Sequence, residues 1–350
     1  MELPATLVEL TPEWLSEALS TRCPGTVVKS VEVESAIWGT ASKIFLRLAY
    51  ASCPENNPPT ALCVKGGFQE ELREVAGIGY RLEASFYRDI APLLGGALPS
   101  CWYAETDDSL NQGLVVLDDL RAHHASFGRA GMSYSVDEVA AALELQAGWH
   151  ARTWGGVSAA SWLTVGSPFF RHAMAGLFFQ PEHWDRMLAL PQAQCLPEAM
   201  RDRGRMLAGL HRQWELEDAA LPCLTHGDAH IGNTYRVPGE LAPRFIDWQV
   251  LSLNPWPVDV SYFLVGALTT EDRQAHDDAL LRHYLDVLVK HGVDAPDIEA
   301  AWDACRLHQL HGVMWAFVPP EMQDPEGCAE MARRHVQAAI DYGTFDRLGV

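Results

Sequence analysis

The stretch that decides the fold reads His226-Gly227-Asp228-Ala229-His230-Ile231-Gly232-Asn233, and Asp247 follows fourteen residues after its last position, at the end of an apolar run. Asp228 and Asn233 have the D-x-x-x-x-N spacing of a kinase catalytic loop, and Asp247 stands where a kinase places its main metal-binding aspartate. Phosphoryl transfer needs an acidic group that accepts the proton of the attacking hydroxyl, and oxygen ligands that hold Mg²⁺ against the phosphates. We therefore predict a phosphoryl-transfer site in which Asp228 is the base or hydroxyl-orienting group, and Asn233 and Asp247 bind Mg²⁺.

A simple turn is the alternative explanation of this loop, because glycine and aspartate favour turns for backbone reasons alone. The flanking segments 221–225, 234–237 and 244–248 have the composition of short strands, which favours an exposed loop between strands. The two histidines of the loop could suggest zinc, but no cysteine or third histidine lies nearby in the sequence. We expect His226 and His230 to be structural.

Five segments in the first third of the chain have the composition and patterning of β-strands. They cover residues 28–38, 43–50, 61–65, 99–106 and 113–118. Helix signals lie beside them, since Thr11 and Pro12 are typical of a helix N-terminus and residues 70–93 have helical periodicity. The pattern predicts a five-stranded antiparallel sheet accompanied by helices.

Lys65 ends the third of these strands, where a lysine is rarely buried without a partner. Glu83 borders the apolar face of the helix predicted over 70–93. That face is marked by Ile78, Leu82, Phe86 and Ile90. An ion pair between Lys65 and Glu83 would turn the ammonium group toward the α- and β-phosphates of a nucleotide, as in kinases generally. Two unrelated surface charges are the alternative.

The turn over residues 38–42 joins the first two predicted strands. In a kinase-like lobe this turn covers the phosphates, where Thr40 and Ser42 would offer hydroxyl groups. An ordinary hairpin turn explains its single glycine equally well. Where the fifth strand leaves the sheet, backbone groups of Leu117 and Asp119 are candidates for hydrogen bonds to adenine.

The chain after the fifth strand has helical patterning. Ser135 and Glu138 form a capping box that opens a helix predicted to reach Trp154. His150 lies on the buried face of that helix, where a histidine is more often a core residue than a catalytic base. This part of the chain is rich in aromatic side chains, which either fill the core or line a site for an apolar acceptor. They are Trp162, Phe169, Phe170, Phe178, Phe179, Trp184, Trp256, Trp302, Trp315 and Phe317.

The loop H-G-D-x-H-x-x-N, followed by I-D-W-Q, resembles the aminoglycoside phosphotransferase and choline kinase superfamily, and within it the ecdysteroid-kinase-like branch. Other parts of the pattern of that branch follow in order at residues 61–65, 83–87, 114–120 and 149–154, so the similarity covers nearly the whole chain. The chain has Asp118 where the branch usually has glutamate, and its phosphate loop is poor in glycine. Neither departure removes a catalytic group.

The resemblance implies an α+β, bilobal protein-kinase-like fold. Residues 1–117 would form a nucleotide-binding lobe around the five-stranded sheet, and residues 118–350 a larger, mainly helical catalytic and substrate-binding lobe. The resemblance also implies that His226 braces the loop, that Asp259 hydrogen-bonds back to it, and that His150 has a packing role.

The composition excludes several classes of partner. With 26 basic and 46 acidic residues among 350, the chain has a formal net charge of −20 and repels phosphate backbones, so nucleic acid and anionic membranes are poor partners. No apolar stretch approaches the roughly 18 residues that span a bilayer, and the N-terminus lacks signal-peptide features. Eight scattered cysteines favour reduced thiols over a disulfide framework. We expect a cytoplasmic protein.

The sequence thus predicts an ATP- and Mg²⁺-dependent small-molecule kinase whose acceptor is a hydroxyl group of a largely apolar alcohol. The association of the resembled branch with steroid-like alcohols agrees with a steroid- or terpenoid-like acceptor. One alternative is an aminoglycoside-type phosphotransferase with a cationic acceptor, and another is a nucleotide-binding pseudokinase. A pseudokinase is expected to lack at least one key group, whereas Lys65, Asp228, Asn233 and Asp247 are all present. A protein kinase is disfavoured, because no A-P-E segment follows Asp247.

Overall fold

The computed structural model describes residues 1–54, 58–95, 97–158 and 160–350. The chain divides into two compact units. The first consists of residues 1–126 and 246–250, and the second of residues 127–245 and 251–350. The short segment 246–250, which carries Asp247, therefore belongs to the N-terminal unit although it lies far along the sequence.

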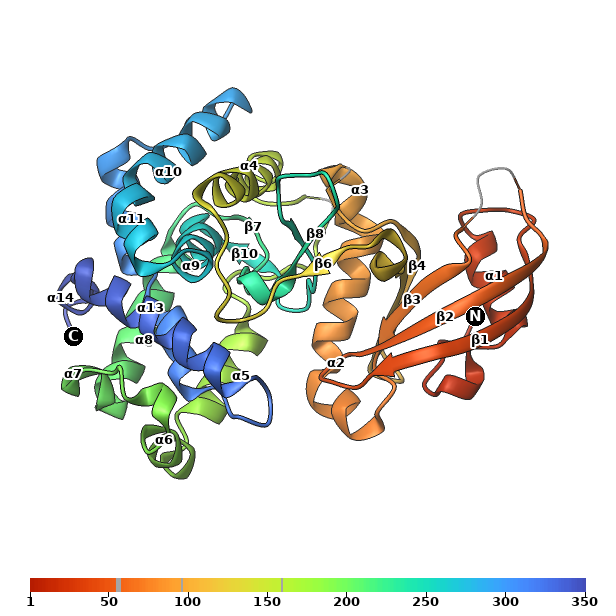
Figure 1. Ribbon diagram of the computed structural model, residues 1–350, viewed down its shortest axis with the longest axis horizontal. Helices are drawn as coiled ribbons and strands as arrows, with labels where there is room; N and C mark the ends of the chain where they lie inside the picture. Colours follow the sequence, from red (N-terminus) through yellow and green to blue (C-terminus); the bar gives the residue numbers. More distant parts are fainter. Residues whose placement is uncertain (55–57, 96, 159) are drawn as a thin grey trace. The chain divides into compact units, whose positions relative to one another are not determined.

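The first unit contains a five-stranded antiparallel sheet in the order β1-β2-β3-β5-β4 (Figure 1). Its strands are β1 (Val27–Ile37), β2 (Ser42–Ser52), β3 (Ala61–Gly66), β4 (Cys101–Asp107) and β5 (Gln112–Asp118). Each lies within a few residues of the range that the sequence predicted. The fold class is confirmed: this is an α+β protein with an N-terminal antiparallel sheet of five strands and a mainly helical remainder.

The two faces of this sheet differ because side chains alternate along each strand. Residues 44, 46 and 48 of β2 are buried in an apolar core with Leu15 and Leu19 of helix α1 (Pro12–Ser20). The helix begins as predicted, with the Thr11 hydroxyl accepting a hydrogen bond from the Trp14 amide at 3.2 Å. The intervening positions of β2, such as Lys43, point to the opposite face, which leaves that face available for polar groups.

The helix predicted over 70–93 is interrupted. It consists of α2 (Glu70–Ser85), a π-helical turn over Phe86–Ile90, and α3 (Ala91–Leu94). Its inward face is as predicted only in part, because Phe86 and Ile90 are fully buried but Ile78 is 38% exposed. Glu83, which was expected to border this face, is only 3% exposed. Gly79, one turn before Glu83, has the backbone of Gln249 within 3.3 Å of where a β-carbon would lie, so the segment 246–250 lies close to this face.

The second unit is mainly helical. Its principal helices are α4 (Val136–Arg152), α5 (Pro168–Phe178), α6 (Pro181–Leu188), α8 (Arg203–Ala219), α9 (Pro257–Ala267), α10 (Thr270–Lys290), α11 (Ile298–Leu307) and α13 (Pro325–Asp341). Shorter ones are α7 (Glu198–Arg201), α12 (Leu310–Val313) and α14 (Thr344–Leu348). Helix α9 is buried along almost its whole length and packs against α4, α10, α11 and α13. It is the central helix of this unit.

Short strands frame the predicted catalytic loop. They are β7 (Cys223–Thr225), β8 (Thr234–Arg236), β9 (Arg244–Phe245) and β10 (Ser252–Asn254), while β6 (Ser126–Phe127) lies where the chain leaves the first unit. Strand β7 pairs with β10 and β8 with β9, both antiparallel. The strand predicted over 244–248 is wrong beyond Phe245, because Asp247 adopts φ 71°, in the left-handed region that strands do not use. The capping box at Ser135 is present, and its helix ends at Arg152.

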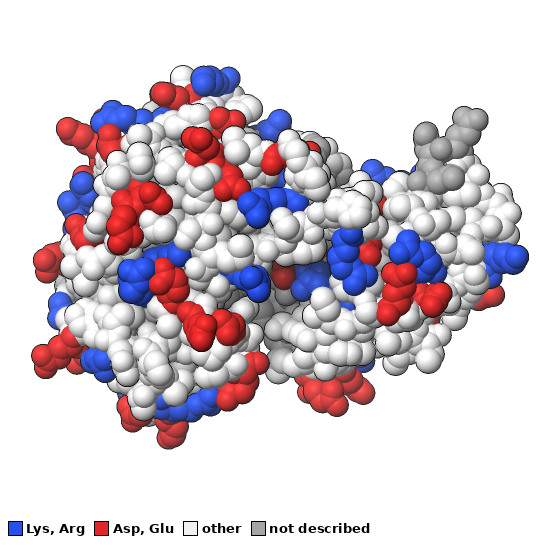
Figure 2. All heavy atoms as spheres, in the orientation of Figure 1, with Lys and Arg blue, Asp and Glu red and all other residues white. Residues whose placement is uncertain are grey.

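Across the described ranges of the chain, no helix is both long and apolar enough to cross a membrane. On the face drawn in Figure 2, acidic and basic side chains are interspersed. The formal net charge of −20 is therefore not gathered into one patch on that face.

Candidate active site

The loop between β7 and β8 has a tight backbone conformation. Gly227 has φ 80°, which glycine adopts without the steric cost that a side chain imposes. The amide of His230 donates to the Asp228 carbonyl at 2.8 Å, and the amide of Asn233 donates to the His230 carbonyl at 2.9 Å. The Nδ1 atom of His230 accepts from the Gly232 amide at 3.0 Å, which caps a single 3₁₀ turn over Ile231–Asn233. These bonds give Asp228 and Asn233 fixed positions.

Helix α9 holds the start of this loop. Asp259, in its first turn, is fully buried, and its carboxylate accepts from the amides of His226 at 2.7 Å and Gly227 at 3.0 Å. The Nε2 atom of His150 lies 3.3 Å from the same carboxylate, and its Nδ1 lies 2.9 Å from the Tyr284 hydroxyl. Asp259 therefore bonds to the loop at the two residues before Asp228, through backbone amides. His150 is a buried, hydrogen-bonded residue that supports Asp259.

Asp228 is surrounded by hydrogen-bond donors, namely an amide, a hydroxyl and an imidazole. The side-chain amide nitrogen of Asn233 donates to Oδ2 of Asp228 at 3.0 Å and to the backbone carbonyl of Asp228 at 2.9 Å. Tyr262 places its hydroxyl 3.5 Å from Oδ1, and His230 places Nε2 3.6 Å from Oδ2. Desolvation alone would raise the pKa of Asp228, but the nearby histidines, above all His230, hold it below its ordinary value. The carboxylate is therefore ionised at neutral pH and can accept a hydrogen bond from a hydroxyl group.

Lys65, Glu83 and Asp247 form a cluster within the first unit. The Nζ atom of Lys65 lies 2.9 and 2.7 Å from the two carboxylate oxygens of Glu83, and 2.8 Å from Oδ1 of Asp247. Burial would lower the pKa of Lys65, but the two carboxylates raise it above its ordinary value, so the ammonium group stays charged. The structure thus brings the three predicted residues together, and the pairing compensates for the burial of Lys65 and Glu83.

Glu83 has a second set of partners in the segment after Asp247. Its carboxylate accepts from the Trp248 amide at 3.3 Å and from the side-chain amide of Gln249 at 3.4 Å. The indole of Trp248 is fully buried and stacks on Phe86, with ring centroids 4.1 Å apart and planes 10° apart. Glu83 therefore fixes both Lys65 and the backbone that carries Asp247.

A second lysine lies beside Asp247. Lys43 pairs directly with Lys65 across β2 and β3, and its Nζ lies 3.8 Å from Oδ2 of Asp247. Like charges directly opposite each other in a sheet repel, and the carboxylate between them offsets that repulsion. Lys43 was not among the residues predicted from the sequence. Antiparallel pairing of the two predicted strands 43–50 and 61–65 would have placed the start of one beside the end of the other.

The other residues predicted to contact nucleotide differ in how open they are to it. Ser42 is 1% exposed, while Thr40 is exposed and its carbonyl accepts a hydrogen bond from the Tyr80 hydroxyl. Leu117 is paired with Cys63 of β3. The amide of Asp119 donates to the Ala61 carbonyl at 3.3 Å and its carbonyl accepts from Ala122 at 2.9 Å, so both backbone groups already have partners. The Asp119 side chain is engaged as well, by Arg121.

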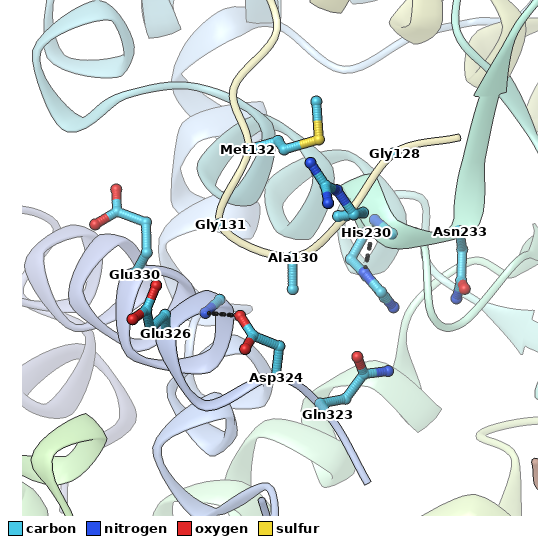
Figure 3. A pocket seen from close by; sticks show the side chains of 13 residues that line it. Gly128, Ala130, Gly131, Met132, His230, Asn233, Gln323, Asp324, Glu326 and Glu330 are labelled. Atoms are coloured by element: carbon cyan, nitrogen blue, oxygen red, sulfur yellow. Dashed lines mark hydrogen bonds between the residues drawn. The ribbon is translucent and has the colours of Figure 1, made fainter. Parts of the chain in front are cut away.

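A cavity of about 540 Å³ adjoins the catalytic loop within the second unit (Figure 3). The loop residues His230 and Asn233 line one side, and the segment 128–132 lines another. The start of α13 contributes the carboxylates of Asp324, Glu326 and Glu330. Gly327 allows this approach, since a β-carbon there would lie 2.7 Å from the Ala130 carbonyl oxygen. The lining is of mixed polarity and contains none of the ten aromatic residues that the sequence singled out.

Half of those ten aromatic side chains are buried. Phe179, Trp184 and Phe317 stack in succession, with centroids 5.1 and 3.8 Å apart, and Trp256 stacks on Tyr284 at 5.0 Å. These residues fill the core of the second unit. Trp315 is different, because its ring meets that of His230 edge-on at 5.0 Å and so approaches the catalytic loop.

A protein-family match includes the segment that contains the catalytic loop. Residues 182–294 match the ecdysteroid kinase-like family. This match confirms the resemblance to that family that the loop sequence indicated. The matched segment contains Asp228, Asn233, Asp247 and Asp259. The loop and the match together support a small-molecule phosphotransferase of the kinase type. No curated protein matches the chain significantly.

Solved structures are similar over most of the chain, at low identity. A spectinomycin phosphotransferase in complex with ADP and spectinomycin has a TM-score of 0.49 and 11% identity, covering 95% of this chain and 98% of that chain. An ethanolamine kinase of Plasmodium vivax gives 0.47 and 9%, covering 88% and 81%. A choline/ethanolamine kinase family protein of Mesorhizobium loti gives 0.42 and 15%, covering 96% and 97%. Because these TM-scores lie below 0.5, we infer function from the loop and from the family match alone.

Proposed function

We propose that this protein is an ATP- and Mg²⁺-dependent small-molecule O-phosphotransferase. The observation that carries the proposal is the braced loop 226–233, in which Asp228 is ionised, held by Asn233 and fixed from behind by Asp259. In the reaction, the acceptor oxygen forms a bond to the γ-phosphorus while the bond from that phosphorus to the ADP oxygen breaks. The hydroxyl proton passes to Asp228 and then to solvent.

The residues present suit a magnesium ion. Mg²⁺ prefers oxygen ligands, and Asp247 and Asn233 keep the ligand roles that the motif assigns to them. Both hydrogen bonds that the Asn233 side chain makes with described residues use its amide nitrogen, so its amide oxygen can face a cation. Asp247 supplies a carboxylate whose partners include the ammonium groups of Lys43 and Lys65, which a metal cation can replace. When bound, Mg²⁺ would neutralise charge on the phosphates.

We propose the remaining roles from the same pattern. Lys65, oriented by Glu83, would contact the α- and β-phosphates. Residues 1–117 would form the nucleotide-binding lobe and residues 118–350 the catalytic lobe. In the former, Thr40 and Ser42 would lie near the phosphates and the backbone of Leu117 near adenine. Asp119 would have to release a backbone partner to take part.

Two chemical classes are candidates for the acceptor. The apolar alcohol predicted from the sequence is supported by the family match, whereas the aromatic side chains that stack in the core of the second unit do not bear on it. A second candidate, a cationic acceptor of the aminoglycoside type, is favoured by the cavity beside the loop, where the carboxylates of Asp324, Glu326 and Glu330 outnumber the guanidinium group of Arg129. Apolar acceptors would bind in proportion to buried apolar area, and cationic ones through charge.

Phosphoryl transfer from labelled ATP to a panel of acceptors tests the proposal. The panel contains steroid- and terpenoid-like alcohols together with polyamine aminoglycosides, each at low and at high salt. Turnover of apolar alcohols that is insensitive to salt would support the first class, and turnover of polyamines that salt suppresses would support the second. Tight nucleotide binding without transfer to any acceptor or to water would contradict the kinase proposal and indicate a pseudokinase.

A further inference from the structure

Two side chains of helix α9 point toward the catalytic loop. Asp259 and Tyr262 are three residues apart and therefore lie on one face of the helix. Asp259 binds the backbone amides of His226 and Gly227, while Tyr262 extends its hydroxyl to 3.5 Å from Oδ1 of Asp228. One buried helix thus contacts the backbone before the catalytic aspartate and also its carboxylate.

The direction of the hydrogen bonds at Tyr262 follows from its neighbour Trp315. An indole N–H can only donate, so the Nε1 of Trp315, 2.8 Å away, gives its hydrogen to the Tyr262 oxygen. The hydroxyl hydrogen is then left to point elsewhere. Among the described residues, Asp228 Oδ1 is the acceptor that the structure places within reach of it. Burial also raises the pKa of Tyr262 well above its ordinary value, so the hydroxyl keeps its hydrogen.

The ring of Tyr262 has little freedom to move. Tyr262 is 5% exposed, and its ring meets those of His311 and His335 at centroid distances of 4.7 and 5.2 Å. His335 is itself packed against Gly312, where a β-carbon would lie only 2.0 Å from its Nδ1. The hydroxyl of Tyr262 is therefore presented to Asp228 from a rigid position.

The two oxygens of the Asp228 carboxylate have different partners. Oδ2 accepts from the Asn233 amide at 3.0 Å, while Oδ1 faces Tyr262. A carboxylate oxygen has two lone pairs, so Oδ1 can accept from Tyr262 and from an acceptor hydroxyl together. We propose that Tyr262, held by Trp315, is a positioning residue that fixes the rotation of the Asp228 carboxylate so that Oδ1 receives the acceptor hydroxyl. This inference rests on the proposed kinase function.

The first test is Tyr262→Phe, which removes only the hydroxyl group. Loss of one hydrogen bond that orients the reacting carboxylate should lower kcat about 10-fold, while KM for ATP and for the acceptor change less than about twofold. Tyr342→Phe is the control, because Tyr342 is partly buried and its hydroxyl bonds to Arg273 and Asp277, away from the loop. It should leave kcat unchanged. Melting temperatures of both variants establish that they fold.

A double-mutant cycle separates positioning from mere packing. If Trp315 acts through the Tyr262 hydroxyl, Trp315→Phe alone should lower kcat about threefold but have no further effect in the Tyr262→Phe background. Likewise, Tyr262→Phe should have no effect on the residual rate of Asp228→Asn. Independent, multiplying effects in either cycle would overturn the inference, as would a Tyr262→Phe variant with wild-type kcat.

The same measurements distinguish this inference from the function on which it rests. Wild-type protein that turns over an acceptor or hydrolyses ATP, with an equally active Tyr262→Phe variant, contradicts the positioning role alone. Wild-type protein that transfers phosphate neither to an acceptor nor to water contradicts the proposed function, and the inference with it.

Discussion

Asp247 and Asp228 are held in opposite ways, each within its own unit. Asp247 lies between two ammonium groups, those of Lys65 at 2.8 Å and Lys43 at 3.8 Å. Asp228 has an amide, a phenol and an imidazole around it, and only the last of these can become charged. Cationic partners can be exchanged for a metal ion, whereas donors that carry no permanent charge fix the direction of a carboxylate without pairing it with a fixed cation.

The backbone segments that carry the two aspartates are also held by different kinds of contact. Asp247 has φ 71°, a conformation that aspartate tolerates better than most residues, and Glu83 secures the residues after it. Asp228 lies in a loop whose preceding amides bind Asp259. The first arrangement depends on one ion-pair cluster and the second on a buried helix, so the two should respond differently to substitution.

The largest effect is expected at Asp247. Asp247→Ala should abolish phosphoryl transfer, because it removes the proposed Mg²⁺ ligand and leaves Lys43 and Lys65 facing each other without a carboxylate between them. ATP stabilises the folded state by an amount that depends on its affinity, so the magnesium-dependent part of the thermal shift should disappear. Thermal unfolding with ATP, in Mg²⁺ and in EDTA, measures this. Equal shifts in both conditions, in the variant and in the wild type, would show that Asp247 is not a ligand.

The next effect is expected at Asp228. Asp228→Asn keeps the size of the side chain but removes its charge, and should lower kcat by about 10²–10⁴-fold. Nucleotide affinity should change little, because the residue acts on the acceptor. Steady-state kinetics together with ATP titration measure the two quantities separately. A variant with wild-type turnover, or one that fails to bind ATP, would remove the difference drawn between the two aspartates.

The site residues that could be predicted from the sequence are those that belong to a short sequence motif or to one secondary-structure element. The loop 226–233, the strand ending at Lys65 and the helix containing Glu83 all follow from short-range pattern, and the predicted ion pair is present. The partners of Asp247 could not be read in this way, because Lys65 and Asp247 are 182 positions apart. Tyr262 was missed too, although its spacing from Asp259 places both on one helix face.

Patterns of apolar residues failed where a polar or small residue occupies a buried position. The inward face of α2 was expected to include Ile78, but Ile78 is exposed, and the buried face includes Glu83 and Gly79, to which the backbone of Gln249 lies close. Similarly, the apolar run before Asp247 predicted a longer strand than β9, because nothing in its composition reveals a left-handed residue. Charge pairing determines which face of α2 is buried, and backbone conformation determines where β9 ends.

A smaller loss should follow from Glu83→Gln. The glutamine can still accept from the Trp248 amide but no longer balances the charge of Lys65, so kcat/KM for ATP should fall about 10- to 100-fold. Breaking a buried ion pair should also cost about 3 kcal/mol of unfolding free energy, measured by denaturant titration. The control is Glu105→Gln, whose half-exposed pair with Arg88 should contribute less than about 1 kcal/mol. Equal losses in the two variants would mean that Glu83 is an ordinary surface charge.

The smallest effect is expected at Lys43, the outer of the two lysines. Its side chain is 34% exposed and 3.8 Å from Asp247, so solvent screens the pair and stability should change by less than about 1 kcal/mol. If the ammonium group moves to a phosphate when a metal ion takes Asp247, Lys43→Gln should raise KM for ATP about three- to tenfold at low salt and less at high salt, with kcat unchanged. Lys29→Gln, on the exposed side of β1, is the control and should leave KM unchanged. A fall in kcat with unchanged KM would instead mean that Lys43 acts on Asp247 and not on a phosphate. In that case Lys65 would be the only lysine that leaves Asp247 for a phosphate when a metal ion binds.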